Sequence, residues 1–248
     1  MLAIIGGTGL TQLANLQMHR RQIVRTPYGD PSCALTFGSI HGREVVFLAR
    51  HGYGHTIPPH KVNYRANIWA LHAAEVRDVV ALASVGGIGV ALTPGALALP
   101  DQIIDYTWGR ESTYFSGIDR SVVHVDFTHP YCAAQRGRIV RAAQQAGEHL
   151  VEGGTYAATQ GPRLETAAEI DRLARDGADM VGMTGMPEAA LARELGLCYA
   201  ALAIVVNYAA GRGTSADGVH MEDINAVSRQ AVGRVHRILD ALVMLDGD

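Results

Sequence analysis

Cysteine is scarce in this sequence. Its 248 residues include three cysteines, Cys33, Cys132 and Cys198, with no CxxC pair and no Cys/His pair at zinc-binding spacing. Scattered thiols of this kind argue against a disulfide framework and favour a reducing compartment. We therefore expect three free thiols in a cytoplasmic protein.

An excess of basic charge and long apolar runs are missing as well. The net charge is -3, so the sequence lacks the basic surface that binds nucleic acid. No apolar run is long enough to span a membrane. The N-terminus is strand-like and glycine-rich rather than charged and then apolar, which argues against a signal peptide. We expect a protein that binds neither nucleic acid nor membranes.

Short apolar runs and helix-like segments alternate along the chain. Hydrophobic residues make up 48% of the sequence, and its length suits one large α/β domain with a sizeable core, or two small domains. The apolar pattern predicts strands at 2–5, 33–37, 44–48, 79–83, 154–159 and 199–206. It predicts a helix that begins within 58–71 and a second helix that ends at residue 175. Three further helices are predicted over 133–146, 189–195 and 223–245. No linker, repeat or low-complexity segment interrupts the chain, so we predict a single domain over residues 1–248.

Several predicted strands end in residues that suit an anion. Arg50 and His51 follow one strand, and a guanidinium fork beside an imidazole donor is a good phosphate clamp. The glycine loop around Thr8 offers backbone N–H groups and a hydroxyl, although a tight turn explains it about as well. Ser84 ends a further strand among small residues. Because ligands bind at the carboxyl ends of strands in open α/β sheets, we expect these residues to meet at one site.

Three later polar residues also lie next to the ends of predicted strands or helices. Thr184 precedes the predicted helix at 189–195, and Asn207 follows the strand that comes next, so both could face one pocket. A helix cap and a turn residue are the simpler explanations. Glu165 lies just past another strand, where it could accept a ring N–H or serve as an acid favoured by a helix dipole.

Five separated blocks together resemble the family of trimeric purine nucleoside phosphorylases and methylthioadenosine phosphorylases, in the same order over nearly the whole chain. The blocks are Ile5–Leu10, Arg50–Gly52 with His55, Lys61–Tyr64 with Ala66–Ala70, Gly161–Arg163, and Met183–Thr184 with Pro187–Glu188. The resemblance implies a single α/β domain with a central mixed β-sheet flanked by helices, and a homotrimer. It also implies phosphorolysis of a purine nucleoside, with inorganic phosphate as co-substrate and with neither cofactor nor metal.

The resemblance also assigns roles to individual residues. It places five residues at the phosphate site: Thr8, Arg50, His51, Ser84 and Thr184. Met183 matches a methionine beside the ribose. His124, in the polar excursion 107–128, matches a histidine that is lent to the neighbouring subunit's pocket.

The base-reading residues depart from the adenine-specific branch of that family. Methylthioadenosine phosphorylases carry Asp-Tyr-Asp where this chain has Asn207-Tyr208-Ala209. An amide at 207 can donate to O6 and accept from N7–H, and Glu165 matches the glutamate that accepts N1–H in 6-oxopurine enzymes. Each mismatched buried polar group costs ~1–3 kcal/mol, so both departures favour a hypoxanthine-like base. In the reaction, Asn207 is expected to stabilise the departing purine, which carries negative charge.

The sugar end of the expected pocket is apolar. The resemblance places Met221 at the 5′ position with Val219 and Ile224 beside it, whereas a slip of one residue would place His220 there. With a 6-oxopurine reader, an apolar end predicts S-methyl-5′-thioinosine as the substrate, in purine and methylthio salvage. The sequence is also similar to bacterial phosphorylases of that nucleoside. The alternatives are an inosine/guanosine phosphorylase, a methylthioadenosine phosphorylase, and a non-catalytic nucleoside-binding protein, which we would expect to lack an intact phosphate site.

Overall fold

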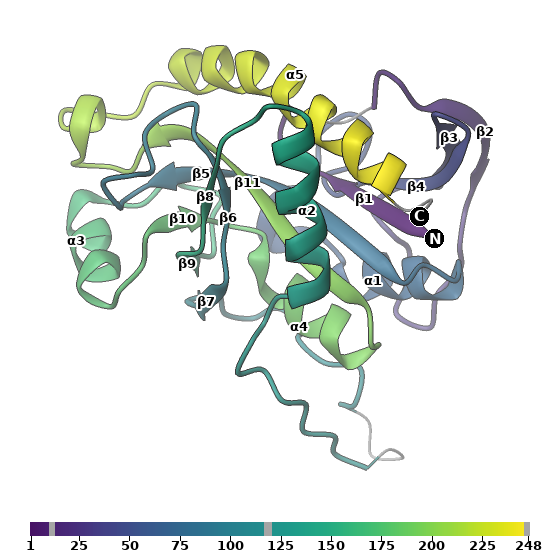
Figure 1. Ribbon diagram of the computed structural model, residues 1–248. Coiled ribbons are helices and arrows are strands. Elements are labelled where there is room, and N and C mark those ends of the chain that lie inside the picture. Colours follow the sequence, from purple (N-terminus) through teal and green to yellow (C-terminus); the bar gives the residue numbers. More distant parts are fainter. Residues whose placement is uncertain (10–12, 117–120, 246–248) are drawn as a thin grey trace.

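The computed structural model describes residues 1–9, 13–116 and 121–245, so Leu10 and residues 117–120 of the polar excursion lie outside it. Its centre is one mixed sheet of eleven strands (Figure 1). The strands are β1 (Leu2–Gly6), β2 (Gln17–Gln22), β3 (Leu35–Ile40), β4 (Arg43–Ala49), β5 (Asp78–Gly87), β6 (Leu97–Leu99), β7 (Gln102–Asp105), β8 (Leu150–Glu152), β9 (Thr155–Ala158), β10 (Met180–Gly182) and β11 (Cys198–Tyr208).

Strand β5 organises the sheet, because it pairs with three other strands. It runs parallel to β1 along its first part and to β11 along its whole length, and β1 in turn runs parallel to β4. Its last residues, Gly86 and Gly87, pair antiparallel with β10, which leads to β9 and β7. The carboxyl ends of β1, β4, β5 and β11 therefore meet near the start of the segment that follows β10.

Helices cover both faces of the sheet (Figure 1). One core cluster contains buried residues of α1 (Tyr64–Ala73) and α4 (Gly185–Glu194), and the other contains those of α2 (Ala133–Gln145) and α5 (Met221–Leu245). Strand β1 shows why both faces are apolar: Ala3 and Ile5 enter the first cluster, while Leu2 and Ile4 enter the second. The short helix α3 (Ala167–Arg175) packs over the β9–β10 end. The predicted α/β fold with a mixed central sheet is confirmed.

Some elements differ from the sequence prediction. The strand expected to stop before Asn207 continues to Tyr208, after a register shift between Val205 and Asn207. The helix expected from residue 58 is preceded by a 3-10 turn, and α1 itself begins after Asn63, whose side chain accepts the Ala66 N–H. Strands β2, β6, β7, β8 and β10 were not predicted. Three of them have three residues each, β7 has four, and β2 is polar and exposed, so none shows the longer apolar run on which the prediction relied.

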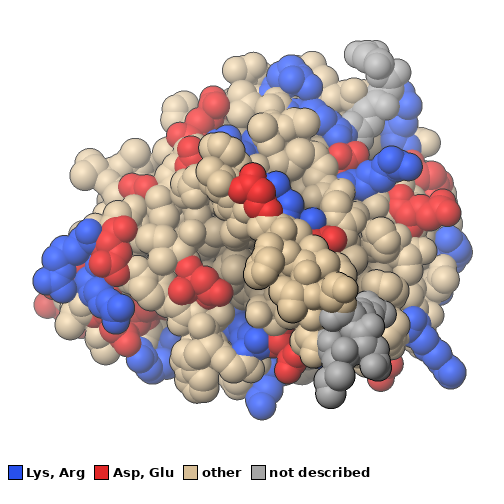
Figure 2. All heavy atoms as spheres, turned by 90° about the horizontal axis from the view of Figure 1, so that it is seen from below, with Lys and Arg blue, Asp and Glu red and all other residues tan. Residues whose placement is uncertain are grey.

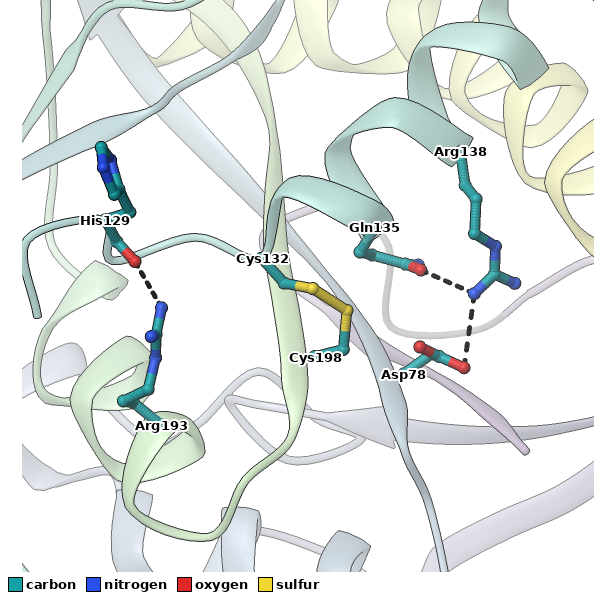
Figure 3. The surroundings of a disulfide bond; sticks show 7 residues. All are labelled: Asp78, His129, Cys132, Gln135, Arg138, Arg193 and Cys198. Carbon is teal, nitrogen blue, oxygen red and sulfur yellow. Dashed lines mark hydrogen bonds and ion pairs between the residues drawn. A yellow bond between two sulfur atoms is a disulfide. The ribbon is translucent and has the colours of Figure 1, made fainter. Parts of the chain in front are cut away.

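The expectation of three free thiols is wrong. Cys132 and Cys198 form a disulfide with their Cα atoms 5.1 Å apart, and Cys33 alone is free (Figure 3). The two cysteines are 66 positions apart in sequence, so spacing gave no sign of the pairing. They meet because Cys132 directly precedes α2 and Cys198 begins β11, against which α2 packs. The cysteine pattern therefore does not support the inference of a reducing compartment.

The described surface carries charges of both signs. In the view of Figure 2, acidic and basic side chains are interspersed over a largely uncharged surface. Among the helices of the described residues, none is both long and apolar enough to cross a membrane.

Candidate active site

A cavity of about 440 Å³ lies at the carboxyl ends of β1, β4, β5 and β11. All the residues predicted for the site line it, except His124. On the predicted phosphate side these are Thr8, Arg50, His51, Ser84 and Thr184. On the predicted nucleoside side they are Glu165, Met183, Asn207, Ala209, Val219, Met221 and Ile224. The volume suits a small-molecule ligand.

The glycine loop after β1 brings backbone close to the Arg50 side chain. A Cβ atom on Gly7 would lie 2.6 Å from the Leu82 carbonyl oxygen and 3.2 Å from Nη1 of Arg50. Glycine is therefore needed here for close approach. The Ser84 hydroxyl donates to the Thr8 carbonyl oxygen at 3.4 Å, which ties the loop to the end of β5.

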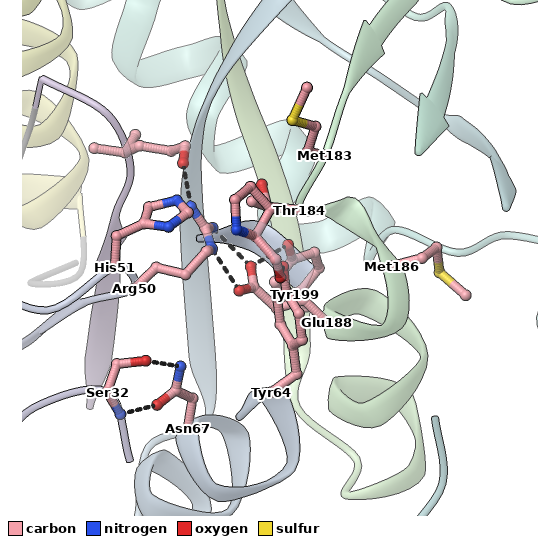
Figure 4. Close-up of polar contacts among 12 residues, drawn as sticks. Ser32, Arg50, His51, Tyr64, Asn67, Met183, Thr184, Met186, Glu188 and Tyr199 are labelled. Carbon is pink, nitrogen blue, oxygen red and sulfur yellow. Dashed lines mark hydrogen bonds and ion pairs between the residues drawn. The ribbon is translucent and has the colours of Figure 1, made fainter. Parts of the chain in front are cut away.

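Arg50 is almost fully buried and already holds a carboxylate (Figure 4). Its Nε and Nη2 donate to the two carboxylate oxygens of Glu188 at 2.6 and 2.8 Å, and Nη1 donates to the Leu82 carbonyl at 2.9 Å. Burial lowers the pKa of the Arg50 guanidinium, but the Glu188 charge outweighs it and the pKa is raised. The expected fork onto a ligand is thus occupied by Glu188. One N–H on each terminal nitrogen is left over, since a guanidinium has five donors.

Glu188 has a second partner in the core. It is fully buried in the first turn of α4, and the Tyr199 hydroxyl donates to its Oε1 at 2.8 Å (Figure 4). A buried carboxylate held by a fork and a hydroxyl keeps the Arg50 side chain in one orientation. The sequence did not single out this role, because an acid early in a helix is explained by the helix dipole.

His51 is held as a neutral ring. Its Nδ1 lies 2.8 Å from the Ile57 carbonyl oxygen, which can only accept, so Nδ1 carries the proton. Burial, with the neighbouring Arg50 charge, lowers the pKa of His51 to about 4. At neutral pH, Nε2 is therefore an acceptor rather than the donor that the sequence suggested. A phosphate that carries a proton can supply the matching O–H.

Thr184 stands at the entrance of α4 with its hydroxyl not used as a cap. It is the N-cap residue, but its side chain makes no capping hydrogen bond. The following Met186 has a non-helical backbone and precedes a cis peptide bond to Pro187. The simpler explanation of Thr184 as a helix cap is therefore not supported, and its side chain lines the cavity.

The base side is shaped by the ends of β9 and β11. Glu165 accepts a hydrogen bond from the Thr159 hydroxyl at 2.6 Å, which orients the carboxylate. The Asn207 amide nitrogen donates to the Tyr208 carbonyl at 2.6 Å, leaving its oxygen and one N–H for another partner. The register shift before Asn207 is a bulge, a feature that re-aims a side chain. Ala209 is buried and adds no polar group.

The residues predicted for the 5′ end of the nucleoside are apolar and belong to the same cavity. Val219, Met221 and Ile224 line it, and Met221 begins α5. His220 is exposed and does not appear among the described residues that line the cavity. Met221, which is 58% exposed, therefore lines the cavity rather than His220, and its assignment to the 5′ position stays a prediction. His124 is also exposed and outside the cavity of its own chain.

Two further residues that the sequence prediction missed lie behind the cavity wall. Thr159 orients Glu165, and Arg110 contacts the segments after β9 and β10. Arg110 lies in the polar excursion, where no strand or helix marks its position. Among the described residues, no group of three or more His, Cys, Asp or Glu side chains is placed to hold a metal ion.

Residues 1–244 match the model of the phosphorylase superfamily. A probable S-methyl-5′-thioinosine phosphorylase of Xanthomonas campestris pv. campestris is 55% identical over 94% of this chain and 93% of its own length. The 6-oxopurine nucleoside phosphorylase of Pyrococcus furiosus is 44% identical over 98% of this chain and 92% of its own. The structure of methylthioadenosine phosphorylase from Schistosoma mansoni in complex with adenine matches with a TM-score of 0.95 at 32% identity, covering 99% of this chain and 91% of that one. Together with the cavity at the strand ends, these matches show that the chain belongs to the phosphorylase superfamily.

Proposed function

We propose that the enzyme is an S-methyl-5′-thioinosine phosphorylase. It would use inorganic phosphate to release hypoxanthine and form 5-methylthioribose 1-phosphate, without a further cofactor. The observation that carries the proposal is the pairing, in one cavity, of a 6-oxopurine reader with an apolar sugar end. The 55% identity to the Xanthomonas protein, whose name gives this activity, supports it.

The base reader follows from hydrogen-bond complementarity. A 6-oxopurine presents an O6 acceptor and an N1–H donor, which match the Asn207 N–H and the Glu165 carboxylate. Adenine presents a 6-amino donor and a bare N1, so N1 would face the Glu165 carboxylate with no proton between them. The Asn207 amide could accept from the 6-amino group only by turning over and losing its bond to the Tyr208 carbonyl. Ala209 supplies no acceptor for the 6-amino group. Leaving buried polar groups unmatched costs ~1–3 kcal/mol each, which is enough to select the base.

The phosphate side supports a dissociative displacement. A phosphate oxygen forms the new bond to C1′ while the C1′–N9 bond breaks and its electron pair moves into the purine. The anion stabilises the positive charge on the sugar, and the Asn207 amide bonds the departing base more strongly than the bound substrate. Proton-bearing phosphate fits the acceptor Nε2 of His51, and Arg50, which keeps one N–H on each terminal nitrogen, lines the same cavity.

The active assembly is proposed to be a homotrimer in which His124 reaches a neighbour's cavity. Its support is the exposed position of His124 and the exposed apolar side chains of the same excursion. Val122 is 73% exposed and Trp108 is 72% exposed, as unpaired interface residues would be.

An inosine/guanosine phosphorylase is the second candidate, favoured by the Pyrococcus furiosus relative. The absence of His220 from the described residues that line the cavity argues against it, because a 5′-hydroxyl calls for a polar partner. The test measures base release from methylthioinosine, inosine and methylthioadenosine in parallel, with and without phosphate. We expect phosphate-dependent release with the highest kcat/KM for methylthioinosine. A preference for inosine would favour the second candidate, and release without phosphate would contradict both.

A further inference from the structure

Arg110 lies between two segments, one after β9 and one after β10, and it contacts both. Each segment carries residues that line the cavity. Nη1 of Arg110 donates to the carbonyl oxygens of Met183 and Met186 at 2.8 and 2.6 Å, in the segment after β10. Its Nη2 donates to the carbonyl oxygens of Thr159 and Gln160 at 3.2 and 2.8 Å, in the segment after β9. The two arms of one guanidinium therefore each hold one segment.

The side chain is fixed in this position by further contacts. Its Nε donates to the Gln160 side-chain oxygen at 3.2 Å, and Nη1 also donates to the Tyr64 hydroxyl at 3.3 Å. The guanidinium carbon lies 5.4 Å from the centre of the Tyr64 ring. A planar fork held on several sides has little freedom left, which a lysine ammonium on a flexible stem could not reproduce.

Each segment that Arg110 holds presents a residue to a different part of the cavity. Thr159 donates its hydroxyl to Glu165 on the base side. Met183 and Met186 bracket Thr184, which lines the predicted phosphate side. Arg110 itself is not among the described cavity-lining residues. It can therefore act on the reaction through these segments, without touching a ligand.

We propose that Arg110 is a positioning residue that sets the spacing between the bound base and the bound phosphate. The inference rests on the proposed phosphorolysis, in which the bond to the base breaks and the bond to phosphate forms at the same carbon. A displacement of about 1 Å between reacting groups can lower the rate about a hundredfold. Loss of Arg110 would loosen this spacing, while each ligand keeps its own partners.

The test compares Arg110→Ala and Arg110→Lys with Arg136→Ala. Arg136 is a matched control, because it is also half-buried and donates to two backbone carbonyls, of Pro100 and Leu99, outside the cavity. For both Arg110 variants we expect kcat to fall about tenfold to a hundredfold, with KM for phosphate changed less than about threefold. Millimolar guanidinium should restore part of the kcat of Arg110→Ala. Arg136→Ala should keep its kcat.

A ligand-binding readout separates this inference from the proposed function. Calorimetry measures the Kd of hypoxanthine with and without phosphate. For the wild type we expect phosphate to lower this Kd. Arg110→Lys should still bind hypoxanthine and phosphate separately, but phosphate should no longer lower its Kd for hypoxanthine. Wild-type kcat in a folded Arg110→Lys variant would overturn the inference. So would a change confined to the KM for phosphate. If the wild type releases no base from any purine nucleoside, the proposed function fails instead.

Discussion

Arg50 shows how far a single residue can be predicted. The sequence placed it at the cavity, because an arginine at a strand end suits an anion. Its partner Glu188 lies 138 positions away, and no local pattern links the two. The buried pair changes what a mutation there would do, because removal of one partner leaves an uncompensated charge and costs ~3–5 kcal/mol.

Thr184 offers the cleaner test of the phosphate side. Thr184→Ala should raise the KM for phosphate about tenfold, the effect of one lost hydrogen bond to a charged ligand, with the melting temperature nearly unchanged. Its hydroxyl makes no capping bond that folding would lose. Arg50→Ala should impair phosphate use and also lower the melting temperature, since Glu188 is left buried and unpaired. Steady-state kinetics at varied phosphate concentration, together with thermal melts, check both predictions. An unchanged KM for phosphate in both variants would contradict the assignment of Thr184 and Arg50 to the phosphate site.

His51 should make stability depend on pH in a defined window. Burial and Arg50 lower its pKa from 6.5 to about 4, so between these values the unfolded chain binds more protons than the folded one. The free energy of unfolding must then rise with pH across this window, by as much as ~3 kcal/mol from this residue. Denaturant unfolding of the wild type and His51→Gln at pH 4 to 7 measures it. Parallel curves for the two proteins would rule this contribution out.

At the scale of elements, long apolar strands were predictable and their edges were not. β11 was expected from its unbroken apolar run, but its bulge and its extension to Tyr208 depend on pairing with β5, which the sequence does not display. The short strand β10 is defined by its partners β5 and β9. These two elements carry Asn207 and lead into Thr184, so the side chains were identified while their geometry was not.

The disulfide joins two elements and should contribute to stability. It closes a 66-residue separation between the start of α2 and the start of β11, which limits the unfolded chain and is worth ~2–5 kcal/mol. A Cys132→Ala/Cys198→Ala variant should melt about 5–15 °C lower than the wild type. A reductant should lower the wild-type melting temperature but leave that of the variant unchanged. Cys33→Ala is the control, because Cys33 is a free thiol. Equal melting temperatures for the wild type, the double variant and Cys33→Ala would show that the disulfide does not form.

For the whole molecule, the order of the matching blocks along the chain predicted the fold and the cavity lining. What the sequence did not reveal is the support behind the cavity: Glu188, Thr159 and Arg110 act through contacts between distant segments. Polar residues of this kind have no apolar period and no fixed spacing that would mark them. They become visible once the strand ends are brought together.

The proposed trimer makes a prediction about the whole assembly. Because His124 lies outside its own chain's cavity, activity should require a neighbour, and His124→Ala should weaken nucleoside binding without changing the KM for phosphate. Sedimentation at assay concentrations should give three times the mass of the 248-residue chain. A fully active monomer would exclude a site shared between subunits.

The central claim is that Asn207, Ala209 and Glu165 read a 6-oxopurine, and a base-exchange variant tests it most directly. Asn207→Asp combined with Ala209→Asp replaces the amide and the apolar residue by two acceptors for a 6-amino group. One hydrogen bond exchanged for a repulsion is worth ~1–3 kcal/mol, so the ratio of kcat/KM for methylthioinosine to that for methylthioadenosine should fall about ten- to a hundredfold. Ala210→Asp, which adds a carboxylate at the neighbouring cavity position, is the control and should move the ratio far less. A folded double variant that keeps the wild-type ratio would show that the base is read elsewhere.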